Sequence, residues 1–319
     1  MHKMRGMAGV LLAVLSCAAA AQNFPAKPVR IVVPFPPGGG VDIVARVIGP
    51  KLAAQYGQQV IVENRAGAAG IIGTEFAARS APDGYTVGLT AITLATAPHL
   101  GKVPFDAFKD FTYISNLVSM TPLIVANPAL PAKTLPELVA HAKANPGKIA
   151  YGTPGIATVP HLGAEMLQTA AGIKLNHVPY KGSAEALADV LGNRVDFYFA
   201  PISTTLAHVQ GNRVRAIAVS TIKRSSILPT IPTIAESGVP GFDFSLWFGV
   251  WAPTGVPQPV INKISQSIKA AGNDAGVKSK LAGLGNEPME MDPAQFAKFV
   301  RSEIEVGAKV LQAAGIKPQ

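Results

Sequence analysis

Short apolar segments alternate with amphipathic helical segments along almost the whole chain. Strands are predicted over residues 29–33, 59–63 and 85–90, with helices over 41–56 and 70–80 between them. This alternation is typical of α/β proteins, in which helices cover sheets whose strands are largely parallel. We therefore expect an α/β fold.

A second complete α/β set occupies residues 123–244. Its predicted strands lie near residues 148–152, 195–200 and 214–220. A strand over 248–253 and a final helix over 292–314 follow, and they need another core to pack on. Two capping boxes, beginning at Thr134 and Asp292, mark helix starts in the two sets.

We therefore expect two α/β lobes joined by short hinge strands, with a ligand cleft between them, because such interfaces commonly hold small molecules. The first lobe would comprise residues 22–122 and 249–319, and the second lobe residues 123–248.

Residues 1–21 have the organisation of an export signal. Lys3 and Arg5 provide a basic start, residues 7–15 an apolar run, and Ala19-Ala20-Ala21 the small side chains before cleavage. The apolar run is shorter than the roughly 20 residues that span a membrane. We expect a periplasmic protein that begins near Gln22.

Cleavage would remove Cys17, the one cysteine of the chain, so the mature protein would form no disulfide and no thiolate metal site. Lipidation of Cys17 is an alternative, although the bulky Leu15 disfavours it.

The whole chain carries a formal charge of +9, and loss of Lys3 and Arg5 leaves +7. Its basic residues are scattered, without the clusters that a nucleic-acid surface needs. We therefore expect no nucleic-acid partner and a protein that attracts small anions.

A glycine-rich loop, Pro34-Phe35-Pro36-Pro37-Gly38-Gly39-Gly40-Val41-Asp42, lies between the first predicted strand and helix. Glycines allow a ligand to approach the backbone, and the helix start presents free N–H groups and a positive dipole end. The loop lacks the Gly-Lys-Ser/Thr ending of a phosphate-binding P-loop and the glycine spacing of a dinucleotide-binding fingerprint. It is predicted to bind an anion, with a plain tight turn as the alternative.

A second loop, Tyr151-Gly152-Thr153-Pro154-Gly155-Ile156-Ala157-Thr158, also joins a strand to a helix. Thr153 and Thr158 offer hydroxyl groups, although Thr158 has a sufficient structural role as a helix cap. Two such loops, one in each lobe, suggest a carboxylate that is held from both sides.

Motifs for catalysis are missing from the sequence. It contains no Gly-x-Ser-x-Gly elbow, no His-Glu-x-x-His pair and no acidic cluster. Five histidines of the mature chain are remote from one another in sequence, and each is expected to be a capping or surface group: His99, His141, His161, His177 and His208. We expect no enzymatic activity, no metal and no cofactor.

Several short motifs of both predicted lobes together form a recognisable family pattern. They include Pro36 to Asp42, Val62 to Ala68, Pro82 to Thr86, His161-Leu162, His177 to Gly182, Pro232 to Gly238 and Trp247-Phe248-Gly249. In this order the chain resembles the receptors of tripartite tricarboxylate transporters, also called the Bug family of periplasmic solute-binding proteins. The resemblance covers almost the entire mature chain.

The resemblance implies a type II periplasmic binding protein fold that closes over its ligand. It also implies a membrane permease of one large and one small subunit as partner, and we expect the receptor to be a monomer. Members typically hold a ligand carboxylate through backbone groups and ordered waters at the two loops. Carried over to this chain, the ligand-binding residues are Phe35, Pro36, Gly38, Gly39, Gly40, Thr90, Thr153, Gly155 and Thr158.

The pattern differs from the family's at two places. Pro154 and Ala157 stand where many members have Ser or Gly. Many members also have an acid at the position of Ala200, where it can pair with a ligand amine, so Ala200 disfavours an amino-acid ligand. Ile156, Tyr198 and Phe199 would make the site more apolar, and both aliphatic di- or tricarboxylates and aromatic acids are open as ligands.

Two other functions are alternatives to a transport receptor. A receptor that presents its ligand to a signalling partner would have the same soluble fold. An enzyme on the same scaffold would need a nucleophile and a base within hydrogen-bond reach, and no motif supplies such a pair.

Overall fold

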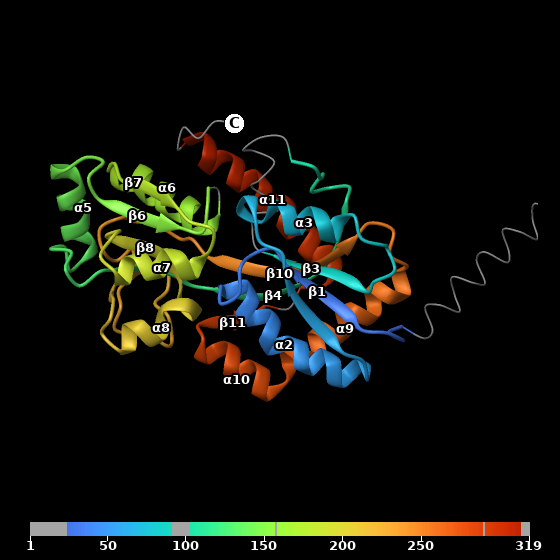
Figure 1. Cartoon of the computed structure of the whole chain (residues 1–319). Coiled ribbons are helices and arrows are strands. Elements are labelled where there is room, and N and C mark those ends of the chain that lie inside the picture. Colours follow the sequence, from blue (N-terminus) through green and yellow to red (C-terminus); the bar gives the residue numbers. More distant parts are fainter. Residues whose placement is uncertain (1–23, 91–102, 157, 290, 314–319) are drawn as a thin grey trace, which may run out of the picture.

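The computed structural model describes residues 24–90, 103–156, 158–289 and 291–313. These residues form a six-stranded sheet in the order β11-β4-β10-β3-β1-β2 and a five-stranded sheet in the order β7-β6-β8-β5-β9. The two sheets lie side by side, each with its own helices (Figure 1). We call the six-stranded sheet and its helices the first lobe, and the five-stranded sheet and its helices the second. The predicted export signal and His99 lie outside the described residues.

The first lobe is built from both ends of the chain. Its strands are β1 (Val29–Val33), β2 (Val60–Asn64), β3 (Thr86–Thr90), β4 (Phe111–Met120), β10 (Leu246–Pro253) and β11 (Asn286–Pro288). Its helices are α2 (Gly40–Tyr56), η1 (Ala68–Gly70), α3 (Ile71–Ala78), α9 (Gln258–Asn273), α10 (Ala275–Gly283) and α11 (Pro293–Ala313).

The second lobe is built from the middle of the chain. Its strands are β5 (Pro122–Ala126), β6 (Ala150–Thr153), β7 (Asn176–Pro179), β8 (Phe197–Pro201) and β9 (Arg215–Val219). Its helices are α5 (Leu135–Ala144), α6 (Val159–Ala171), α7 (Ser183–Leu191) and α8 (Ile202–Gln210). Across the described ranges of both lobes, no helix has the length and apolar character that crossing a membrane requires.

The sheets are mixed: most strands of each sheet run in one direction, as predicted, but each sheet also contains antiparallel pairs that the sequence did not predict. In the first lobe β1 is parallel to β2 and β3, whereas β10 is antiparallel to β3 and β4, and β11 is antiparallel to β4. In the second lobe β6 is parallel to its neighbours, and β5 is antiparallel to β8 and β9. Parallel neighbours require a crossover helix. Strands β5 and β10 follow the crossings between the lobes, and they enter their sheets without one.

The chain crosses between the lobes at two short segments. Strand β4 ends at Met120 and β5 begins at Pro122, so Thr121 alone joins the two sheets. On the return, β10 begins at Leu246, which pairs with Met120. The first sheet therefore resumes at Leu246, a few residues before the boundary expected at residue 249.

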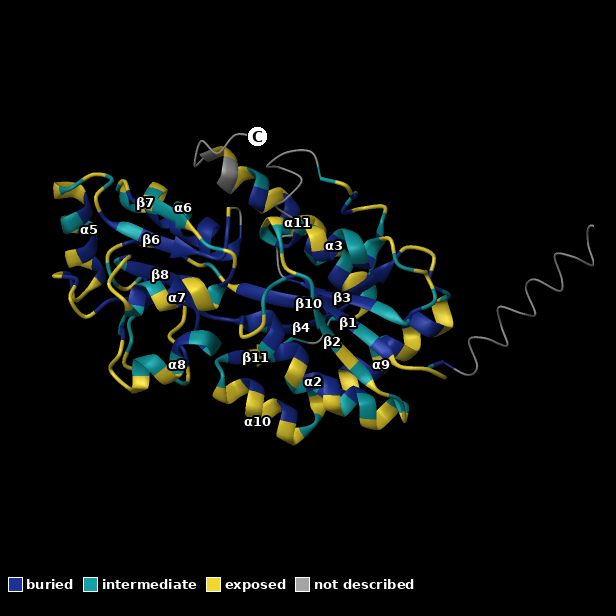
Figure 2. Cartoon of the chain, viewed as in Figure 1, coloured by how far each residue is buried: buried dark blue, intermediate teal, exposed yellow. Residues whose placement is uncertain are grey.

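Both faces of the second sheet are covered, as strand β5 illustrates. Ile124 and Ala126 belong to a buried cluster with residues of α5 and α6, whereas Leu123 and Val125 belong to a cluster with residues of α7 and α8. Successive side chains of a strand point to opposite faces, so a strand covered on both sides is apolar at every position. The inner strands of both sheets are accordingly buried in Figure 2, whereas the edge strands β2 and β7 are partly exposed.

The lobes are in contact with each other beyond the two crossings. Helix α11 of the first lobe contacts α6 of the second, and α2 contacts α8. Val159 and Leu162 of α6 are buried in the same apolar cluster as the strands of the first sheet. The structure therefore shows a closed arrangement of the two lobes.

Candidate ligand-binding cleft

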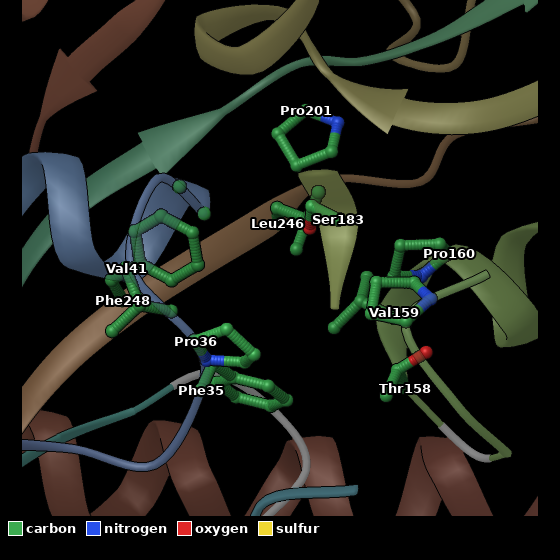
Figure 3. A pocket seen from close by; sticks show the side chains of 13 residues that line it. Phe35, Pro36, Val41, Thr158, Val159, Pro160, Ser183, Pro201, Leu246 and Phe248 are labelled. Atoms are coloured by element: carbon green, nitrogen blue, oxygen red, sulfur yellow. The ribbon is translucent and has the colours of Figure 1, made fainter. Parts of the chain in front are cut away.

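A cavity lies where the two lobes meet, and Figure 3 shows the side chains around it. The space between its lining atoms, including solvent at its open mouth, is about 480 Å³. From the first lobe it is lined by Phe35, Pro36, Gly39, Gly40, Val41, Leu246 and Phe248. From the second lobe it is lined by Pro154, Thr158, Val159, Pro160, Ser183 and Pro201. None of these lining residues carries an ionisable side chain.

Four helices begin at this cavity. Gly39 precedes α2, Thr158 precedes α6, Ser183 is the first residue of α7, and Pro201 precedes α8. The first amides of a helix have no partner within the helix, and the helix dipole places partial positive charge there. The cavity is therefore polarised to hold an anion, although none of the described residues that line it is basic.

All four helix starts at the cavity lack a side-chain cap; α3 and α9, which begin elsewhere, lack one too, whereas three other helices are capped. None of α2, α6, α7 and α8 has a side-chain hydrogen bond that caps its first turn. By contrast, Thr134 caps α5, Asp274 caps α10, and Asp292 with Gln295 forms a reciprocal capping box on α11. Those three helices begin away from the cavity. The amides at the cavity are left available to a ligand.

The glycine-rich loop of the first lobe is held from behind by Asp42. Gly38 has a φ of 83°, a left-handed conformation that favours glycine, and its N–H donates to Asp42 Oδ2 at 2.9 Å. Arg46 Nε donates to both carboxylate oxygens of Asp42 at 3.0 Å. Asn64 Nδ2 donates to Asp42 Oδ1 at 2.9 Å and to the Phe35 carbonyl at 3.0 Å. The network fixes both ends of the loop while the Gly39 and Gly40 backbone faces the cavity.

Burial and hydrogen bonding oppose each other at Asp42, whose residue is 3% exposed. Burial raises the pKa of its carboxyl, but hydrogen bonds from Arg46, Gly38 and Asn64 outweigh this and hold the pKa below the usual 3.8. Asp42 is therefore ionised at neutral pH. Its charge lies in the first turn of α2 and also braces the loop.

The loop of the second lobe is held by hydroxyl groups. Thr158 Oγ1 donates to the Gly155 carbonyl at 2.7 Å, and the Gly155 N–H donates to Thr153 Oγ1 at 3.2 Å. Thr153 Oγ1 is also hydrogen-bonded to His177 Nε2 at 2.6 Å. Thr158 therefore tightens its own loop and leaves the start of α6 uncapped.

Two of the histidines meet behind this loop. The rings of His161 and His177 are stacked with centroids 4.0 Å apart, beside Tyr151, whose hydroxyl donates to Glu165 at 2.6 Å. Burial, followed by the nearby charge of His161, lowers the pKa of His177 to about 4, against the charge of Glu165. We expected capping or surface roles because these residues are distant in sequence, which was wrong for this pair. The parallel strands β6 and β7 place His177 beside Tyr151.

The hydroxyl–imidazole pair of Thr153 and His177 is the arrangement closest to a nucleophile with its base near the cleft. Thr153 is fully buried, and neither residue lines the cavity. The pair therefore supports the loop and does not face a ligand. Within the described ranges, no group of three or more His, Cys, Asp or Glu side chains is placed to hold a metal ion.

The structure brings about half of the predicted site residues to the cavity. Those that line it are Phe35, Pro36, Gly39, Gly40 and Thr158. Gly38, Thr153 and Gly155 lie behind the loops and shape them. Thr90 and Ala200 are buried and do not line the cavity. Ala200 faces the core beneath α7 and α8 because the next residue of the strand, Pro201, takes the cavity side.

Several lining residues were not predicted from the sequence. They are Val41, Pro154, Val159, Pro160, Ser183, Pro201, Leu246 and Phe248. Ser183 follows a strand and a glycine and begins a helix, which is the same pattern that identified the other two loops. Ile156, Tyr198 and Phe199, expected to make the site apolar, do not line the cavity, and Val41, Leu246 and Phe248 do so instead. Trp247 is packed on α11, where its Nε1 donates to Glu303 at 2.9 Å.

Known proteins match the chain along nearly its whole length. The model of tripartite tricarboxylate transporter family receptors matches residues 44–316. The protein BugT of Bordetella pertussis is 35% identical, over 99% of this chain and 99% of its own. The structure of the periplasmic binding protein BugD superposes with a TM-score of 0.89 at 36% identity, covering 93% of this chain and all of that one. A structure of the R. palustris protein Rpa4515 with adipate gives a TM-score of 0.90 at 32% identity, with 93% and 100% coverage.

Proposed function

The chain belongs to the tripartite tricarboxylate transporter receptor family and has the fold of periplasmic binding proteins, and on this premise we propose that it captures a small organic carboxylate between its lobes and delivers it to a membrane permease. The receptor does no chemistry on the ligand. It acts in the periplasm after cleavage of residues 1–21, as a monomer, with a permease of one large and one small subunit.

One observation carries the proposal. Four helices from two lobes start at one cavity, without side-chain caps, and no ionisable side chain lines that cavity. Each helix start contributes amides and a partial positive charge, so a carboxylate there gains hydrogen bonds on several sides. Because α2 belongs to the first lobe and α6, α7 and α8 to the second, the set is complete only when the lobes are together.

The walls of the cavity favour a particular class of acid. A ligand ammonium group would need an acceptor of opposite charge, and none of the lining residues is acidic. Phe35, Val41, Leu246 and Phe248 instead offer apolar surface to a carbon skeleton. The ligand is accordingly a carboxylic acid without an amine, either an aliphatic di- or tricarboxylate or an aromatic acid. Adipate, present in the related R. palustris structure, belongs to this class.

The proposal is tested by a ligand screen on the mature protein after denaturation and refolding, which removes any acid carried through purification. A ligand bound only by the folded form raises the melting temperature by mass action. We expect one or more aliphatic or aromatic carboxylates to raise it, the matching amino acids to have no effect, and the bound acid to be recovered unchanged. Stabilisation by amino acids alone, or conversion of the acid, would contradict the proposal.

A further inference from the structure

The turn before α7 touches the other lobe at Gly182. Its φ of −168° and ψ of 170° are extended values that any residue adopts, so its own backbone does not require a glycine. A Cβ atom at this position would nevertheless lie 2.9 Å from Cγ and 3.2 Å from Cδ of Pro36. Pro36 belongs to the glycine-rich loop of the first lobe and lines the cavity.

Other glycines also lie against the opposite lobe, and a Cβ atom on Gly285 would be closer still, 2.7 Å from Cγ2 of Ile202 in α8. A Cβ atom on Gly155 would be 3.2 Å from Cβ of Ala69, and one on Gly40 would be 3.4 Å from Oγ of Ser203. Gly285 has a φ of 72°, which by itself favours glycine, and it meets an isoleucine side chain, whereas Gly182 is extended and meets a proline ring, which cannot rotate away as a long side chain would. A methyl group at residue 182 therefore collides with the first lobe only when the lobes are closed.

We propose that Gly182 is a positioning residue for closure, which accepts the Pro36 ring in the space that a side chain would fill. The combined size of residues 36 and 182 then determines how far the lobes close, and so how well the four helix starts meet a ligand. This inference rests on the proposed two-lobe capture. It adds a residue that the sequence did not place in the site and that does not itself line the cavity.

The expected effect of Gly182→Ala is a shift from the closed towards the open arrangement. Apparent affinity falls in proportion to the population of the binding-competent form. Forced overlap in a packed contact is costly, and we expect adipate, or another acid found in the ligand screen, to bind about tenfold more weakly. The melting temperature without ligand should stay the same, because the overlap is absent from the open form.

Closure can be measured without any ligand by disulfide trapping. A Cβ atom on Gly39 would lie 3.8 Å from Oγ of Ser183 across the cleft, so cysteines at these two positions would face each other when the lobes are together, as a disulfide requires. The mature chain has no cysteine, so Gly39→Cys with Ser183→Cys reports closure alone. We expect Gly182→Ala to slow oxidative trapping about tenfold, and Pro36→Ala in the same chain to restore the rate.

The control is Gly283→Ala at the end of α10, where an added Cβ meets nothing within 4 Å; it should trap at the unmodified rate. Trapping of Gly182→Ala at that rate, or a defect that Pro36→Ala does not relieve, would overturn the inference. If the trapping rates change as expected but the protein binds no carboxylate, the proposed function would be refuted, and the inference about Gly182 and closure would remain supported.

Discussion

The two rims of the cleft present the same groups to a ligand but are built differently. The first rim, residues 35–42, is braced by the ionised Asp42, which joins Gly38, Arg46 and Asn64. The second rim, residues 153–158, is braced by the hydroxyls of Thr153 and Thr158, with His177 behind them. Asp42 stands behind the first rim, and Thr153 and His177 stand behind the second, whereas Thr158 both braces its loop and lines the cavity.

The difference teaches where charge is useful in such a site. A charged side chain inside an apolar cavity would lose hydration whenever the cavity is empty. Placed behind the loop, Asp42 keeps its hydrogen-bond partners in every state and holds the amides in position. Backbone amides fixed in this way need little reorganisation when a carboxylate arrives.

The largest effect should come from removing the charged brace of the first rim. Asp42→Ala leaves the Gly38 amide and the Asn64 side chain without their acceptor, and we expect a loss of about 2–3 kcal/mol in the free energy of unfolding. Thr153→Val removes the matching brace of the second rim and should cost about 1 kcal/mol. Urea titrations of both variants measure the comparison, and equal losses would show that charge gives the first rim no special role.

Obstruction of the first rim should weaken binding without weakening the fold. Gly39 has φ −78° and ψ 164°, which valine adopts, and a Cβ there meets only Pro36 O and Ser183 Oγ, at 3.7 and 3.8 Å. Gly39→Val should therefore lower ligand affinity at least tenfold, about 1.4 kcal/mol, at an unchanged melting temperature. Calorimetric titration with native-like affinity would remove the loop from the site.

Acid should affect the second rim before the first. The pKa of His177 is lowered to about 4 from 6.5, mainly by burial, so the unfolded chain binds the proton more readily and stability falls between pH 6.5 and pH 4. After allowance for its partial exposure, we expect a loss of about 1 kcal/mol at pH 5. Because the pKa of Asp42 is lowered, its stabilisation is lost only below pH 3.8.

Variants separate the two contributions. The melting temperature of His177→Gln should fall less than that of the parent protein between pH 6.5 and pH 4. The melting temperature of Asp42→Asn should stay below that of the parent protein by a constant amount over that range. The difference should narrow only below pH 3.8, where Asp42 of the parent protein is protonated. A parent protein that loses the same stability as His177→Gln throughout this range would contradict the assignment.

The smallest effect is expected at a helix start outside the cleft. Thr134 Oγ1 accepts from the Glu137 amide and caps α5, so Thr134→Ala should cost about 0.5–1 kcal/mol of stability. Ligand affinity should not change, because α5 does not reach the cavity. An affinity loss in this variant would mean that capping anywhere in the second lobe affects binding, and the distinction between capped and uncapped helices would lose its meaning.

Local patterns were sufficient to predict much of the architecture. The strand at Val29–Val33 and the capping boxes at Thr134 and Asp292 follow from short-range chemistry, and the structure confirms them. Strand direction was not predictable in the same way, because it depends on where the chain crosses between lobes. The pairing of Leu246 with Met120 joins residues far apart in sequence.

The site was predictable where a motif is continuous and unpredictable where folding assembles it. Gly39 and Gly40 are adjacent in a loop whose glycine-rich composition predicts that a ligand can approach the backbone closely. Ser183, Pro201 and Phe248 reach the same cavity from three further elements, and only the packing of the lobes brings them together. Ala200, predicted from its position in the family pattern, faces the core, and its neighbour Pro201 lines the cavity, because successive residues of a strand face opposite sides.

The central claim is that a carboxylate is held by backbone amides from both lobes, and a crystal structure of the protein with its tightest-binding acid tests it most directly. The account predicts a carboxylate group between the start of α2 and the starts of α6 and α7, hydrogen-bonded directly or through one water to amides of both lobes, in a closed arrangement. An acid that contacts only one lobe, or that is held by a lysine or arginine side chain, would contradict it.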